Sequence, residues 1–171
     1  FGQILAQRPD LIPREYTEEL EKLEDSVPAF EWEEAEQIIE EEIGLEKFSD
    51  IDREPLAAAS IAQVHCATLQ NGEEVVVKVK RPGIDEQVRK DLEILEFFAK
   101  EAEKHSRIAK HSDVLKFVRQ FSEWTREELD LEREGLNAQI FKENLEGEEN
   151  LKVPEVYPEL NTEKVLVMEY V

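Results

Sequence analysis

Residues 55–83, PLAAASIAQVHCATLQNGEEVVVKVKRPG, constrain the fold more than any other part of the chain. Two apolar, β-prone runs flank Gln70-Asn71-Gly72-Glu73, and Asn-Gly between such runs predicts a tight hairpin with a type I′ turn. In the second run, residues 75–80, side chains alternate between the two faces of a strand. Lys78 is therefore expected on the face opposite the core. The core face is expected to carry three valines, Val75, Val77 and Val79.

Lys78 has two interpretations. It is either an exposed lysine on the solvent side of a half-buried sheet, or a functional lysine beside the small-residue loop that precedes the hairpin. The order of strand, tight loop, strand, hairpin and strand with a central lysine is the layout of a kinase N-lobe. There G-x-G-x-x-G-x-V covers the phosphates and V-A-I-K lies on the third strand. Here Val-Val-Val-Lys ends at Lys78, and matching Val64 to the motif's valine puts alanines at the glycine positions, namely Ala57, Ala59 and Ala62.

The alanines have a physical consequence, because each added Cβ restricts the backbone and its approach to phosphate. The sequence Ala-Ala-Ala-Ser-Ile-Ala-Gln-Val-His, residues 57–65, resembles the alanine-rich loop of the UbiB/AarF family of atypical kinases. Phe1-Gly2-Gln3 matches the last three positions of that family's K-x-G-Q motif, whose lysine would precede Phe1, and Gln3 is its matched glutamine. The resemblance implies a nucleotide-covering loop formed by Ala57, Ala58, Ala59, Ser60, Ala62 and Val64.

A second part of the resemblance lies in the acidic segment at residues 126–137. On a helix Asp130 and Glu134 lie one turn apart and share a face, whereas Glu128 is offset. The segment is either an exposed acidic helix or a site that holds a cation. Glu128-Leu-Asp130 followed by Glu134 resembles the family's E-x-D signature and the glutamate downstream of it. The resemblance implies that Glu134 is the helix-C glutamate that pairs with Lys78, and that Glu128 and Asp130 face the K-x-G-Q lysine and the nucleotide pocket.

Two amphipathic helical patterns separate Lys78 from Glu134. The first has Asp85 as its expected cap and ends near His105, and the second begins at Ser112-Asp113. We interpret them as a helical insertion at about residues 84–122, which UbiB-like proteins have and ordinary kinases lack. Their apolar stripes comprise Val88, Leu92, Leu95, Phe98 and Ala99, then Leu115, Val118, Phe121 and Trp124.

Residues 153–157 and 164–171 read as two further strands. Taken alone, the last one is a buried strand. It also resembles the strand that leads into a kinase hinge. That resemblance implies that Met168 lines the back of an adenine pocket, and that Glu169 and Val171 offer backbone groups to the base.

Together these patterns predict an α+β fold. Residues 54–171 are expected to form a kinase-like N-lobe, an antiparallel sheet plus helix C. Residues 1–53 are expected to form an N-terminal helical extension, with helix from residue 9 to residue 50, breaks at its prolines and Gly44 as a C-cap. Because H-x-D-x-x-x-x-N and D-F-G are lacking, we interpret the chain as an N-lobe fragment whose C-lobe is absent and which is inactive alone.

Charge narrows the choice of partners. Forty-two acidic residues against twenty-one basic ones give a net charge of −21, which disfavours binding to nucleic acid or to anionic lipid. No run approaches the length of a membrane span and no signal peptide is recognised, so we expect a protein that is cytoplasmic or peripheral to a membrane. Neither His105 nor His111 is assigned a metal or catalytic role.

The functional hypothesis is an ATP-binding N-lobe of a UbiB-like atypical kinase or ATPase. The expected ligand is ATP or ADP with Mg²⁺, whose protein ligands would lie in the C-lobe, and Lys78 is expected to contact the α- and β-phosphates. The resemblance also implies a link to coenzyme Q (ubiquinone) biosynthesis or other isoprenoid-lipid metabolism, with isoprenoid lipids or lipid-biosynthesis proteins as partners. The alternative is a non-catalytic, pseudokinase-like scaffold or helical interaction module.

Overall fold

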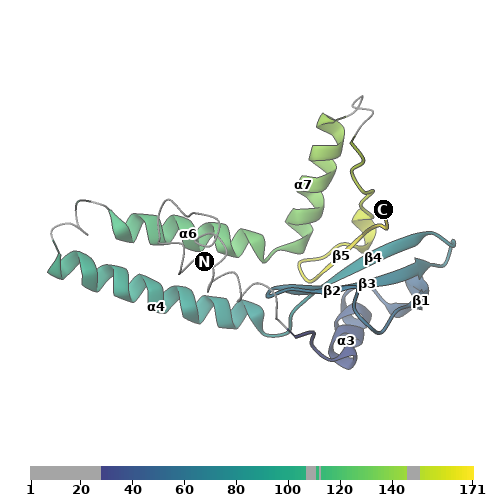
Figure 1. The fold of residues 1–171 in the computed structure, drawn as a ribbon, viewed down its shortest axis with the longest axis horizontal. Coiled ribbons are helices and arrows are strands. Elements are labelled where there is room, and N and C mark those ends of the chain that lie inside the picture. Colours follow the sequence, from purple (N-terminus) through teal and green to yellow (C-terminus); the bar gives the residue numbers. More distant parts are fainter. Residues whose placement is uncertain (1–27, 107–110, 112, 146–150) are drawn as a thin grey trace, which may run out of the picture.

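The computed structural model describes residues 28–106, 111, 113–145 and 151–171. Its centre is an antiparallel sheet in the order β1–β3–β4–β5, with β2 paired to β3 (Figure 1). The strands are β1 Phe48–Ile51, β2 Ala57–Ala58, β3 Ala62–Leu69, β4 Glu74–Lys80 and β5 Val165–Glu169. The helices are α3 Trp32–Glu42, α4 Ile84–His105, α6 Val114–Glu128 and α7 Leu131–Asn144, with short 3-10 turns at Leu45–Lys47 and Pro158–Leu160. The predicted α+β class is confirmed.

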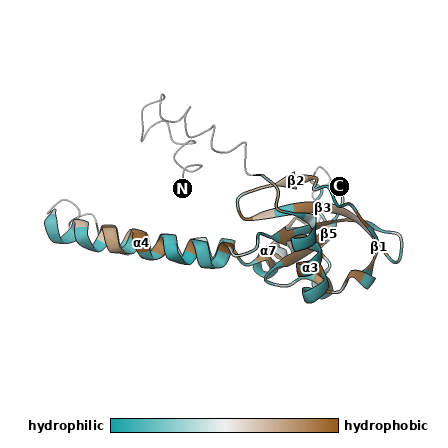
Figure 2. Ribbon diagram, turned by 90° about the horizontal axis from the view of Figure 1, so that it is seen from below, coloured by the Kyte–Doolittle hydropathy of each residue, from teal (hydrophilic) through white to brown (hydrophobic). Residues whose placement is uncertain are grey.

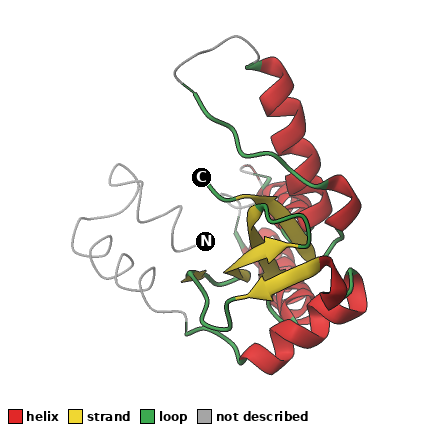
Figure 3. Ribbon diagram, turned by 90° about the vertical axis from the view of Figure 1, so that its right-hand side faces the viewer, coloured by secondary structure: helices red, strands yellow, loops and turns green. Residues whose placement is uncertain are grey.

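The two faces of the sheet differ as the alternation along β4 predicts. Val75, Val77 and Val79 are almost completely buried, and α3 packs against β4 and β5 through Ala35 and Ile39. On the opposite face α7 lies along β5, so that helices cover the sheet from both sides (Figure 3). The side chains of Val76 and Lys78 on that face stay half-buried.

The turn of the central hairpin differs from the predicted type I′ turn. Gly72 has a φ of +89°, but Asn71 is not among the described non-glycine residues with positive φ. The N–H of Gly72 donates to Leu69 O (2.9 Å), and Leu69 N–H donates to Glu73 O (2.9 Å). This is the longer hairpin loop in which an ordinary turn is followed by one left-handed residue, and glycine fills that position at little cost.

The α4 and α6 helices run side by side and project from the sheet, and we call this pair the helical arm (Figures 1 and 2). The predicted end of α4 is confirmed, since Ser106 is its C-cap. Its predicted cap is wrong: Gly83, in the left-handed conformation, is the N-cap, and Asp85 instead accepts from Lys80 Nζ (3.0 Å). Within the described residues each arm helix also leaves part of its predicted stripe open, with Phe98 and Trp124 each 63% exposed.

Two strand assignments require correction. Residues 48–51, which fall in the segment predicted as helical, form β1 and pair with β3, so the sheet begins before residue 53. Residues 153–157 form no strand of their own. Val156 makes an isolated bridge to Met168, and Pro154 has no N–H with which to extend a ladder.

Part of the N-terminal prediction can be compared with the structure. Within the stretch predicted as helical, residues 32–42 form α3; its C-cap is Ile43 and not the predicted Gly44, which follows with a φ of +83°. Phe1-Gly2-Gln3 lies outside the described residues. Within the described part of the chain, no helix is both long and apolar enough to cross a bilayer.

Candidate functional site

Lys78 and Glu134 meet on the face of the sheet that α7 covers. Lys78 Nζ donates to both carboxylate oxygens of Glu134, each at 2.7 Å. The Lys78 side chain is 26% exposed and that of Glu134 is 42% exposed. The structure therefore brings the predicted pair together at a place that solvent, and so a ligand, can reach. Because both groups are solvated in part, their attraction contributes modestly to the stability of the fold.

The close approach of α7 to β5 sets the position of Glu134. A Cβ on Gly135 would lie 2.6 Å from Asn161 Nδ2 and 2.8 Å from Leu166 Cδ1, so only glycine fits there without a shift. Asn161 is itself fixed, because its Oδ1 accepts from Val167 N–H (2.8 Å). Neither Gly135 nor Asn161 was singled out from the sequence. A buried glycine inside a helical pattern, directly after a candidate glutamate, is the signal that could have found the first of them.

Of the two upstream acids, Asp130 lies one helical turn before Glu134, as predicted, because Glu134 N–H donates to Asp130 O (3.2 Å), whereas Glu128 belongs to another helix. Glu128 is the last residue of α6 and is exposed. Asp130 is the N-cap of α7, with an extended backbone, and its side chain accepts from Arg133 N–H (3.1 Å). Aspartate favours this position because its carboxylate satisfies an amide that has no partner within the helix. Asp130 therefore has an extended backbone just before α7, whereas Glu134 lies within the helix.

The alanine-rich loop, residues 57–64, folds back on itself beside Lys78. Ala57 pairs with Val64, and Ala59 N–H donates to Ala62 O (2.8 Å). Val64 pairs with Lys78, which pairs in turn with Leu166. Directly paired residues project from the same face of a sheet, so these four form one row across β2, β3, β4 and β5. Of the other predicted loop residues, Ala58, Ala59 and Ser60 are exposed and Ala62 is buried.

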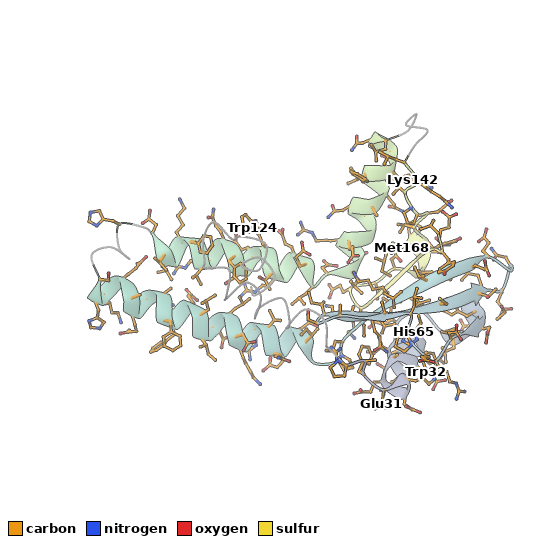
Figure 4. The ribbon with its side chains drawn as sticks, viewed as in Figure 1. Glu31, Trp32, His65, Trp124, Lys142 and Met168 are labelled. Carbon is orange, nitrogen blue, oxygen red and sulfur yellow. The ribbon has the colours of Figure 1, made fainter. Side chains whose placement is uncertain are left out.

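The predicted adenine-site residues lie at the other end of β5. Met168 is half-buried against the cluster of Leu131, Val156 and Leu166, on the α7 side of the sheet (Figure 4). Glu169 N–H donates to Glu155 O (2.7 Å), so this backbone group is already engaged. The Glu169 carboxylate pairs with Lys152 at 2.9 Å, which is the main reason that the pKa of Glu169 is lowered. Val171 is exposed.

A buried polar cluster that the sequence did not reveal lies under the loop, on the α3 side. His65 is fully buried, and its Nδ1 lies 2.8 Å from Asp52 O and its Nε2 lies 2.9 Å from Gln63 Nε2. Burial lowers the pKa of His65, so the ring is neutral at physiological pH. The indole of Trp32 meets the imidazole edge-on at 5.2 Å between ring centroids (Figure 4). These contacts fix the core-facing side of β3.

Two open pockets of about 250 and 300 Å³ lie near the start of β4 and the end of β5, and the smaller one is also lined by residues of β1 and β3. Glu74 and Tyr170 line both, and Cys66 lines the smaller one. Neither of these two pockets includes Lys78 or Glu134 in its lining. Among the described residues no group of three or more His, Cys, Asp or Glu side chains is arranged to hold a metal ion.

Residues 22–171 match the model of the ABC1 atypical kinase-like domain family. The chain is 46% identical to the "Probable protein kinase UbiB" of Azotobacter vinelandii and to that of Pseudomonas entomophila, covering 99% of this chain and 32% of each relative. It is 42% identical to an uncharacterized protein of Synechocystis, of which it covers 29%.

Among solved structures, the erythromycin complex of Rv3197 from Mycobacterium tuberculosis matches with a TM-score of 0.72 and 29% identity, covering 99% of this chain and 43% of that one. The predicted family resemblance and the kinase-like N-lobe architecture are thereby confirmed. The chain spans about a third of the length of the curated relatives that it matches.

Proposed function

Since this chain belongs to the family of ABC1 atypical kinase-like domains, we propose that the Lys78 face of the sheet binds the phosphates of ATP or ADP. The observation that carries the proposal is the two-oxygen contact between Lys78 and Glu134, with both side chains accessible to solvent. A triphosphate requires positive charge held in a defined place, and a lysine fixed by a helical carboxylate supplies it.

The residues around Lys78 fit a nucleotide. In the row from Ala57 through Val64 to Lys78, Val64 is paired directly with the lysine and Ala57 lies two strand spacings, about 10 Å, from the strand that carries it. The lysine face also carries Val76 and Met168, whose apolar side chains suit the floor of a base site. In this proposal Lys78 binds the α- and β-phosphates, Glu134 orients Lys78, and the loop from Ala57 to Val64 covers the phosphates.

Mg²⁺ would neutralise phosphate charge in the complex. We place its protein ligands in the C-lobe of the longer protein, together with the acid that would accept a substrate proton. Glu128 and Asp130 remain proposed members of the site that face the K-x-G-Q segment. The names of the relatives favour an atypical kinase, and we propose that the full-length protein is an atypical kinase or ATPase linked to coenzyme Q or isoprenoid-lipid metabolism.

The test is equilibrium binding of Mg-ATP and Mg-ADP to the full-length protein and to its Lys78→Ala variant. The expected result is binding by the wild type and a loss of at least about tenfold in affinity in the variant, the range of one charge-assisted contact. Lys90→Ala, which removes an exposed lysine of α4, is the matched control and should bind as wild type does. Equal affinity in Lys78→Ala and wild type would refute the assignment. A wild type that binds no nucleotide but keeps a protein partner would establish the scaffold alternative.

A further inference from the structure

Arg81, the residue directly after β4, connects three parts of the chain. Its backbone N–H donates to Ile61 O (2.7 Å). Its side-chain Nη2 donates to Ala59 O (3.1 Å) and to Pro28 O (2.9 Å). Two of these carbonyls belong to the alanine-rich loop, and the third belongs to the segment that leads into α3. One arginine therefore joins the loop to the chain that enters the domain.

The entering segment is held at the same place by two further contacts. The Arg81 guanidinium lies over the ring of Phe30, with 5.3 Å between Cζ and the ring centroid, which is within cation–π range. Phe30 N–H donates to Oε1 of the fully buried Gln63 (3.0 Å). Contacts to the backbone of Pro28 and Phe30 and to the Phe30 ring thus hold residues 28–30 next to the turn between β2 and β3.

We propose that Arg81 is a positioning residue for nucleotide binding, which sets the conformation of the alanine-rich loop and couples it to residues 28–30. The inference rests on the nucleotide function proposed above. The C=O of Ala59 and the N–H of Ser60 belong to one planar peptide group, in which they point in opposite directions. Holding Ala59 O therefore fixes the direction of the Ser60 N–H at the tip of the loop. A loop ordered before the ligand arrives loses less conformational entropy on binding.

Arginine suits this position better than lysine does. The planar guanidinium has several N–H groups in a fixed plane, so it can donate to two carbonyls and at the same time stack on an aromatic ring. A lysine has a single ammonium on a flexible stem. Lysine at this position would keep the charge and part of the hydrogen bonding, but it would lose the stacking on Phe30. Substitution of Arg81 by lysine keeps the positive charge and changes the geometry, whereas substitution by methionine removes the charge as well. Comparing the two variants therefore separates the effect of charge from that of geometry.

The experiment uses the full-length protein as wild type, Arg81→Met, Arg81→Lys and the control Arg89→Met, which removes an arginine of α4 that pairs with Glu86 and Glu93. Mg-ATP and Mg-ADP affinities, ATPase kinetics and amide exchange are measured for each. For Arg81→Met we expect about tenfold weaker nucleotide binding, a matching rise in KM and little change in kcat. Arg81→Lys should fall between this variant and wild type. Amides of residues 57–61 should exchange faster in Arg81→Met, and those of β4 should not.

The outcomes separate this inference from the proposal on which it rests. If the wild type binds no nucleotide, the proposed function itself fails and this inference fails with it. If the wild type binds and both Arg81 variants, folded, bind as tightly, Arg81 is no positioning residue while the nucleotide function stands. Faster exchange spread equally over β4 and the loop in Arg81→Met would make Arg81 a general stabiliser of the fold, and would also overturn the inference.

Discussion

Replacing Gly135 by alanine tests whether the packing of α7 on β5 positions the lysine–glutamate pair. The new Cβ would lie 2.6 Å from Asn161 Nδ2 and 2.8 Å from Leu166 Cδ1, both closer than real Cβ contacts allow. Asn161 cannot simply rotate away, because its Oδ1 holds the Val167 N–H. Leu166 of β5 is completely buried and packs with Leu131 of α7. The strain must therefore move α7, and Glu134 moves with it.

The magnitude follows from two opposing effects. Forcing an extra carbon into a packed site typically costs 1–3 kcal/mol. Replacing glycine by alanine inside a helix returns about 1 kcal/mol. The net expectation is a loss of about 0–2 kcal/mol in the free energy of unfolding. Nucleotide affinity should fall by about tenfold as well, because a small displacement of Glu134 releases Lys78 from its fixed position.

Urea unfolding and nucleotide titration of Gly135→Ala, Asn161→Ala and the double variant measure both effects. Asn161→Ala removes the atom nearest to the new Cβ. The double variant should therefore be less destabilised than the sum of the single variants. If Gly135→Ala instead raises stability by about 1 kcal/mol with unchanged nucleotide affinity, it behaves as an ordinary helical substitution, and the packing argument is refuted.

Three further predictions concern other contacts. Glu134→Gln should lower the free energy of unfolding by no more than about 1 kcal/mol in urea unfolding, because the pair with Lys78 is partly solvated. In a nucleotide titration the same variant should bind about tenfold more weakly. The pKa of Glu42 is lowered mainly by its hydrogen bond from Lys164. The stability that this contact contributes should therefore be present above the ordinary glutamate pKa and be lost as the pH falls toward the lowered pKa of Glu42. Unfolding curves measured between about pH 3 and 6 should show a smaller dependence of the unfolding free energy on pH in Glu42→Gln than in the wild type. Gly72→Ala should lower the free energy of unfolding by about 1 kcal/mol, because φ at this position is +89°. The cost comes from the backbone alone, since no atom lies within 4 Å of the new methyl group. An unchanged midpoint in thermal or urea unfolding would count against this reasoning.

The sequence was most informative where periodicity and burial agree. Alternation along β4 correctly predicted that the valines face the core and that Lys78 lies on the other face. The helical arm was equally readable, because its apolar spacing extends over many turns. Phe98 and Trp124 belong to its predicted apolar stripes, yet both are exposed in the described part of the chain. Periodicity identifies the apolar side of a helix, but it does not show how much of that side a neighbour covers.

Local conformational choices were predicted less well, since each depends on a single backbone group. The acidic segment reads as one helix by composition, but Asp130 satisfies the first amides of α7 as its N-cap, and the helix therefore restarts at Leu131. The roles of Gly135 and Arg81 required three-dimensional information. Each acts on residues distant in the sequence, Leu166 for the glycine and Pro28 for the arginine.

The length of the central hairpin loop determines which residue of β3 faces Lys78. With the observed turn, Thr68 pairs with Glu74 and Val64 pairs with Lys78. A two-residue type I′ turn centred on Asn71-Gly72 would shift β3 by one position against β4 and place His65 opposite Lys78. Because side chains alternate, that shift would bring the buried His65 to the lysine face and send Val64 into the core. The row that runs from the alanine-rich loop to Lys78 therefore depends on the turn that precedes β4, with Gly72 in the left-handed conformation.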